Sequence, residues 1–125
     1  MHTRLMSSTM AQLSIPLSLP SLPPATNYPW SAEVLEAHRG LASAFLSSRR
    51  ALNLDESDPV RLGHHIKQAE TFMVSIVDTL SSQKKNPLPA GYIKGIRDAV
   101  TSLLAGLHTA KAYATSAYAM SCYPF

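Results

Sequence analysis

Hydrophobic residues recur at intervals of three and four positions along three long stretches of this chain. The last stretch is the most regular, and its apolar positions are Ile93, Ile96, Val100, Leu103, Leu107, Ala110, Ala114 and Ala117. This interval places the residues along one face of an α-helix, and such a face has to be covered by other apolar groups. The pattern therefore predicts helices that pack against one another.

The first stretch predicts a helix over about residues 31–52. Ser31 is a suitable N-cap, because its hydroxyl can accept a hydrogen bond from a free backbone N–H of the first turn. Trp30 and Leu35 occupy the two positions of a hydrophobic staple. The residues expected to be buried are Val34, Leu35, Leu41, Ala42, Phe45, Leu46 and Leu52.

The second stretch predicts a helix over about residues 59–85. Asp58 before Pro59 is a strong start signal, because an N-cap carboxylate precedes a proline at the first helical position. The last turn would hold two lysines, whose positive charge complements the helix dipole, and two prolines soon afterwards prevent continuation. The expected core residues are Leu62, Ile66, Ala69, Met73, Ile76, Val77 and Leu80, with Phe72 beside them.

The third stretch predicts a helix over about residues 90–119. Short links join the three helices, and short links favour antiparallel neighbours. The predicted fold is therefore all-α, an antiparallel three-helix bundle spanning about residues 30–120. A short tail over residues 121–125 would follow it.

Residues 1–29 are predicted to form a disordered arm rich in proline and serine. Its second half holds five prolines, and prolines at this spacing forbid a helix. A mitochondrial presequence is also rich in serine and poor in acids, but it carries several arginines, whereas only Arg4 is present here. A secretory signal needs an uninterrupted apolar core, which Ser7 and Ser8 break. An untargeted arm and an intracellular location are favoured, with mitochondrial import as the alternative.

Composition and charge narrow the classes of function. Charged residues make up 15% of the chain, which is low against the usual ~25% and argues against a charge-rich disordered protein. The net charge is +3, and the basic doublets at 49–50 and 84–85 fall near predicted helix ends, so direct nucleic-acid binding is not expected. No run approaches the ~20 apolar residues of a membrane span.

The sequence holds no motif for catalysis or for binding a metal or cofactor. His64 and His65 are adjacent, so their side chains diverge by about 100° on a helix. Neither histidine has a ligand-type residue four positions later, and no serine lies in a G-x-S-x-G context. Cys122 has the spacing of a prenylation box, but Tyr and Pro are poor occupants of its aliphatic positions. We therefore expect a non-enzymatic protein without cofactor, metal or small-molecule substrate.

The predicted function is a non-catalytic helical module for protein–protein interaction or assembly. Leu104, Tyr113 and Tyr118 lie off the main apolar stripe of the third helix and form the candidate interaction surface for a protein partner or a second copy. The alternative is an N-terminal regulatory or assembly segment of a larger, nucleic-acid-acting protein, truncated here. That alternative rests on the abrupt ending at residues 122–125, directly after a long helix.

Overall fold

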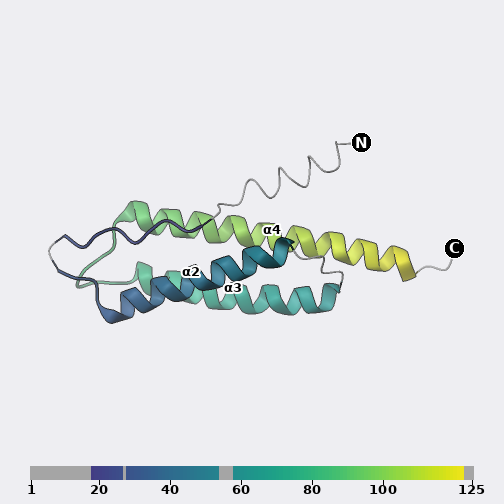
Figure 1. Ribbon diagram of the computed structural model, residues 1–125, viewed down its shortest axis with the longest axis horizontal. Helices are drawn as coiled ribbons and strands as arrows, with labels where there is room; N and C mark the ends of the chain where they lie inside the picture. The colour runs from purple at the N-terminus through teal and green to yellow at the C-terminus, as the bar shows by residue number, and fades with distance from the viewer. Residues whose placement is uncertain (1–17, 27, 54–57, 123–125) are drawn as a thin grey trace.

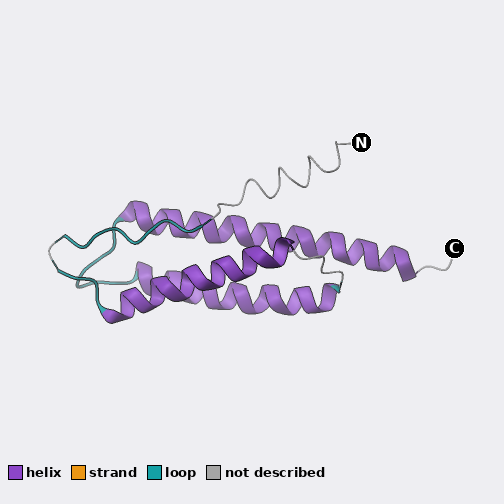
Figure 2. Ribbon diagram, in the orientation of Figure 1, coloured by secondary structure: helices purple, strands orange, loops and turns teal. Residues whose placement is uncertain are grey.

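Three α-helices pack side by side in this computed structural model, and successive helices run in opposite directions (Figure 1). Their bounds are Ala32–Asn53 for α2, Pro59–Ser81 for α3 and Ala90–Cys122 for α4. The structure describes residues 18–26, 28–53 and 58–122, without the side chains of Asn53 and residues 117–122. Within these ranges the chain forms helices and loops and no strand (Figure 2). The predicted all-α antiparallel three-helix bundle is confirmed.

The start of α2 and the start of α3 are each fixed by a side chain that accepts hydrogen bonds from free backbone N–H groups. The Ser31 hydroxyl accepts a hydrogen bond from the backbone N–H of Val34 at 3.2 Å. One carboxylate oxygen of Asp58 accepts from the N–H groups of Val60 at 3.0 Å and Arg61 at 3.4 Å. Both residues act as the N-caps that the sequence predicts, because each satisfies donors that have no partner inside the helix.

The end of α3 lies four residues before the predicted one, at Ser81. The backbone N–H of Ser82 still donates to the carbonyls of Asp78 and Thr79. The Gln83 side-chain amide also donates to the Thr79 carbonyl, at 2.9 Å. Side chains near the C-terminus thus satisfy carbonyls that a further turn of helix would have used. The two lysines follow in the connection to α4 and do not lie in the last turn.

One hydrophobic core joins the three helices. It contains Val34, Leu41, Phe45, Leu62, Ile66, Ala69, Met73, Val77, Leu80, Leu88, Tyr92, Ile96, Ala99, Val100, Leu103, Leu107 and Ala114. The predicted stripe of α3 is buried except for Ile76, which is partly buried. The prediction for α2 was wrong at Leu35 and Leu46, which are 44% and 43% exposed. Both lie about 100° from a core residue, on a flank that the neighbouring helices do not cover.

The second half of the predicted arm packs against the bundle. The described part of the chain begins at Ser18, so the rest of the arm lies outside it. We call residues 18–26 and 28–30 the strap; it forms neither helix nor strand and runs beside the first half of α4 (Figure 1). Leu19, Leu22 and Trp30 are partly buried against the core, and the Trp30 indole N–H donates to the Pro23 carbonyl at 2.7 Å. The proline-rich composition of this segment does not predict this packing.

Two glycines of α4 provide a matched test of the strap. A Cβ atom at Gly95 would lie 2.8 Å from Cγ of Pro20, whereas one at Gly91 would meet nothing within 4 Å. We expect Gly91→Ala to raise the free energy of unfolding by up to about 1 kcal/mol, because alanine loses less backbone entropy in a helix. We expect Gly95→Ala to lower it by about 1 kcal/mol, because the strap has to shift.

Urea titrations of both variants, alone and with Pro20→Gly, measure the coupling between Gly95 and the strap. Removing the proline ring is expected to abolish the penalty at Gly95. A Gly95→Ala variant as stable as Gly91→Ala in the unaltered background would contradict the observed strap position.

Candidate interaction site

Two of the three residues of the predicted interaction surface, Leu104 and Tyr113, lie on opposite sides of α4. Leu104 is partly buried against the core, whereas Tyr113 is 72% exposed. Nine positions separate these two residues, so they lie about 180° apart around α4. Tyr118 lies in the last part of the helix, and its side chain is outside the described set. Of the three, Tyr113 alone is seen as an exposed aromatic side chain.

The last turns of α4 extend past the other two helices (Figure 1). A Cβ atom at Gly63 would lie 3.4 Å from Cε of Lys111, which fixes the alignment of α3 and α4 at this point. Since α3 begins at Pro59 and runs the opposite way, α4 has no α3 residue beside it beyond about residue 115. Among the described side chains of α4, Ala114 is the last one that is buried in the core.

A groove runs between α2 and α3 and has mainly apolar exposed walls. Its lining residues are Ala44, Ser47, Ser48, His64, His65, Lys67, Gln68, Ala69, Thr71, Phe72 and Ser75. We call it the α2–α3 groove. On the α2 side the lining side chains are all alanine or serine, so the groove stays open there. Small residues of this kind allow close approach of another backbone.

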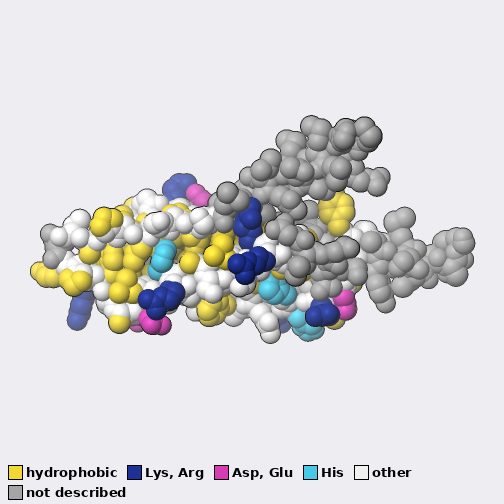
Figure 3. Space-filling view, in the orientation of Figure 1, with side chains coloured by type: hydrophobic (Ala, Val, Ile, Leu, Met, Phe, Trp, Pro, Cys, Tyr) yellow, Lys and Arg dark blue, Asp and Glu magenta, His cyan; other side chains and the backbone are white. Residues whose placement is uncertain are grey.

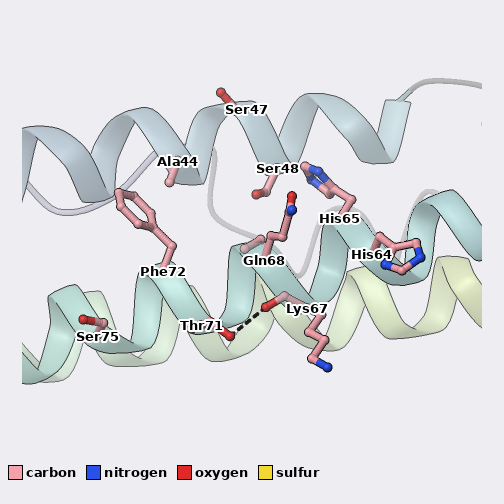
Figure 4. A pocket seen from close by; sticks show the side chains of 11 residues that line it. Ala44, Ser47, Ser48, His64, His65, Lys67, Gln68, Thr71, Phe72 and Ser75 are labelled. Atoms are coloured by element: carbon pink, nitrogen blue, oxygen red, sulfur yellow. Dashed lines mark hydrogen bonds between the residues drawn. The ribbon is translucent and has the colours of Figure 1, made fainter.

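Phe72 is the largest apolar group of the α2–α3 groove. Its ring points from α3 towards α2, beside Ala44 (Figure 4). The residue is 51% exposed, although an aromatic side chain of this size gains free energy by leaving water. About half of the surface of this residue is thus exposed and available for contact with a further apolar group. The sequence pattern places Phe72 beside the core stripe of α3 but does not indicate a groove.

Three polar side chains converge beside Phe72. Ser48, His65 and Gln68 point towards one another between the two helices (Figure 4). Ser48 is 2% exposed, which makes it the buried polar residue of the described core. Nε2 of His65 is buried without a hydrogen-bond partner among the residues that the structure describes. A buried polar atom of this kind costs free energy until a partner satisfies it.

A second polar contact connects α2 to α4. Nδ1 of His38 lies 2.6 Å from the hydroxyl of Tyr92, and the two rings are tilted by 41° with centroids 5.8 Å apart. Burial raises the pKa of Tyr92 to about 12 and lowers the pKa of His38 below its usual 6.5. Both residues therefore stay neutral at physiological pH, and the pair holds two helices together. Sequence reasoning missed it because 54 positions separate the residues.

The lowered pKa of His38 predicts a loss of stability in mild acid. The unfolded chain takes up a proton on this histidine near pH 6.5, and the folded chain does so only at lower pH. The stability due to neutral His38 is present above pH 6.5 and is lost as the pH falls from 6.5 towards the lowered pKa. We expect His38→Gln to reduce this slope. Urea titrations across that range would contradict the interpretation if both proteins lost stability equally.

In the part of the chain that the structure describes, charged side chains do not gather into one large patch. Lys and Arg are scattered over the face shown in Figure 3. The ion pairs Glu36–Arg39, Glu70–His108 and Lys94–Asp98 are all exposed, and exposed pairs contribute at most about 1 kcal/mol each. Among the described residues, no three His, Cys, Asp or Glu lie close enough to hold a metal ion. In the same part of the chain, no helix is long and apolar enough to cross a membrane.

Comparison with protein-family models, curated proteins and solved structures found no match to this chain.

Proposed function

We propose that this protein is a non-catalytic helical module that binds other polypeptide chains through its α2–α3 groove. The observation that carries the proposal is the half-exposed residue Phe72 beside a wall of small α2 side chains. An amphipathic helix recognises a groove of this kind by placing apolar side chains in it. Such a helix would become the fourth member of the bundle.

The composition of the groove supports a peptide partner. Its walls offer apolar surface and uncharged hydroxyl and amide groups, with Lys67 and His64 at one end. Lys67 points away from α2 in Figure 4, so its charge does not enter the space between the helices. A partner helix therefore needs small and apolar residues on its binding face, together with a few hydroxyl or amide groups.

Co-purification from the native source with matched charge variants tests this proposal. We expect Phe72→Glu to lose the proteins that the unchanged chain retains, because a carboxylate in the apolar groove would have to be desolvated. Leu46→Glu is the matched control, since Leu46 has similar exposure and does not line the groove. Circular dichroism confirms that both variants stay helical. Equal retention of partners by the two variants would contradict the proposal.

A further inference from the structure

We infer that a cavity at one end of the bundle binds a small phosphate ester that carries a flat aromatic ring, such as a nucleoside monophosphate. The cavity lies where the end of the strap, the start of α2 and the connection between α3 and α4 meet (Figure 2). We call it the end cavity. It shares no lining residue with the α2–α3 groove, so the inference goes beyond the proposed function.

The size and the polarity of the end cavity suit a small polar ligand. Its volume is about 1040 Å³, and sites for small molecules usually measure about 300–1,000 Å³. Its exposed walls are about equally polar and apolar, whereas those of the α2–α3 groove are mainly apolar. An apolar helix would leave polar groups of the end cavity without hydrogen-bond partners, so a polar ligand is favoured.

Two hydrogen bonds hold the connection between α3 and α4 against the other walls of the cavity. The Gln83 side-chain amide donates to Oε1 of Glu33 in α2 at 3.0 Å. The Asn86 side-chain amide donates to the carbonyl of Tyr28 in the strap, at the longer distance of 3.4 Å. Lys84 and Lys85 lie between these two anchored residues. Their backbone is thus positioned before a ligand arrives, which reduces the entropy lost on binding.

The lysine pair gives the end cavity its positive charge. Lys84 and Lys85 both line the cavity and are exposed, and neither forms an ion pair with a residue that the structure describes. The lining contains one carboxylate, that of Glu33, which already accepts the hydrogen bond from Gln83. Two ammonium groups therefore outweigh one carboxylate. A phosphate group matches this excess, because it can accept hydrogen bonds from both lysines.

Tyr28 and Trp30 of the strap supply aromatic surface in the same cavity. Tyr28 is 69% exposed, so most of its surface is available to a ligand. The Trp30 indole is held in place, because its N–H donates to the Pro23 carbonyl at 2.7 Å. Aromatic side chains stack on flat rings such as nucleobases. Lysines beside aromatic side chains therefore point to a ligand that combines an anionic group with a flat ring.

The fluorescence of Trp30 tests the inference in the full chain. Trp30 is the single tryptophan of the sequence and lines the end cavity, so its emission reports binding there. The titrants are adenosine monophosphate, adenosine and inorganic phosphate, each at low salt. We expect the nucleotide to bind with a dissociation constant below about 1 mM, and its two parts to bind at least about tenfold more weakly.

A lysine double variant tests the anionic half of the ligand. We expect Lys84→Gln with Lys85→Gln to weaken nucleotide binding at least about tenfold and to remove most of its dependence on salt. The matched control is Lys67→Gln with Lys94→Gln. It changes the net charge equally at two exposed positions outside the end cavity, so binding should stay as in the unchanged chain. Circular dichroism checks that both variants keep their helices.

Tyr28 variants test the aromatic half of the ligand. We expect Tyr28→Ala to weaken the nucleotide and leave phosphate binding unchanged, whereas Tyr28→Phe keeps the stacking surface and binds as the unchanged chain does. Equilibrium dialysis measures the same affinities without relying on Trp30. The inference would be overturned by absence of nucleotide binding up to about 5 mM. Equal binding by the two lysine double variants, or phosphate binding as tight as nucleotide binding, would also overturn it.

Discussion

Replacing Phe45 with alanine is expected to lower the free energy of unfolding by about 3–5 kcal/mol. Phe45 is fully buried and is among the largest side chains of the core. Its removal takes away the free energy of burying the ring and leaves a cavity that the neighbouring helices fill only in part. Single domains have total stabilities of about 5–15 kcal/mol, so this one change would leave much of the chain unfolded.

The neighbouring residue supplies the control. Leu46→Ala also removes a large apolar side chain from α2, but Leu46 is 43% exposed. We expect it to cost less than about 1 kcal/mol, because little surface returns to water and no enclosed cavity forms. Urea titrations followed by circular dichroism give both values. Equal losses for the two variants would mean that α2 packs through a different face.

Replacing Leu19 and Leu22 together with serine is expected to cost about 2–3 kcal/mol. Both leucines belong to the strap and are partly buried against the core. A full leucine burial stabilises by about 1.5–3 kcal/mol, and partial burial supplies a fraction of that for each residue. Loss of the pair would expose the first half of α4, where Pro20 lies against Gly95.

Two serines of the strap serve as controls. Ser18 and Ser21 are exposed neighbours of the leucines, so replacing both with alanine is expected to change stability by less than about 0.5 kcal/mol. Amide exchange of α4 gives a second measurement, since Leu19→Ser with Leu22→Ser should speed exchange in its first half. Unchanged stability and unchanged exchange would show that the strap does not cover the bundle in solution.

The helices were predictable because local signals and the core pattern agree. Asp58 and Pro59 fix the start of α3, and the apolar interval after them corresponds closely to its buried face. The stripe of α4 was also predicted in large part, yet Tyr92 and Ala99 are buried without having been expected. Burial at the edge of a stripe depends on which neighbour lies on that side, and periodicity does not contain that information.

The sites were far less predictable, because they depend on the placement of whole helices. Helical spacing places Leu35 and Leu46 on the predicted apolar face of α2, but they are exposed because they lie on a flank that the neighbouring helices do not cover. The α2–α3 groove arises from the approach of two helix flanks, and its alanines and serines look like ordinary helix-surface residues in the sequence. Similarly, helical spacing predicts Leu104 to be exposed because it lies off the apolar stripe of α4. In the structure Leu104 is partly buried against the core.

The packing of the strap does not follow from composition alone. Prolines exclude a helix, yet an extended chain can still pack if apolar residues lie among the prolines. Leu19, Leu22 and Trp30 provide such contacts, and the Trp30–Pro23 hydrogen bond closes the segment on itself. The relevant signal was the leucine and tryptophan content among the prolines.

Amide hydrogen exchange of the unchanged full chain tests most directly whether the three helices share one core, on which the strap and the groove depend. We expect the slowest exchange at backbone amides around Phe45, Met73 and Leu103, because the core of the bundle opens only on global unfolding. These three regions should exchange with similar free energies. Rapid exchange in any one of them, or three clearly different free energies, would show that the helices do not form a cooperative bundle.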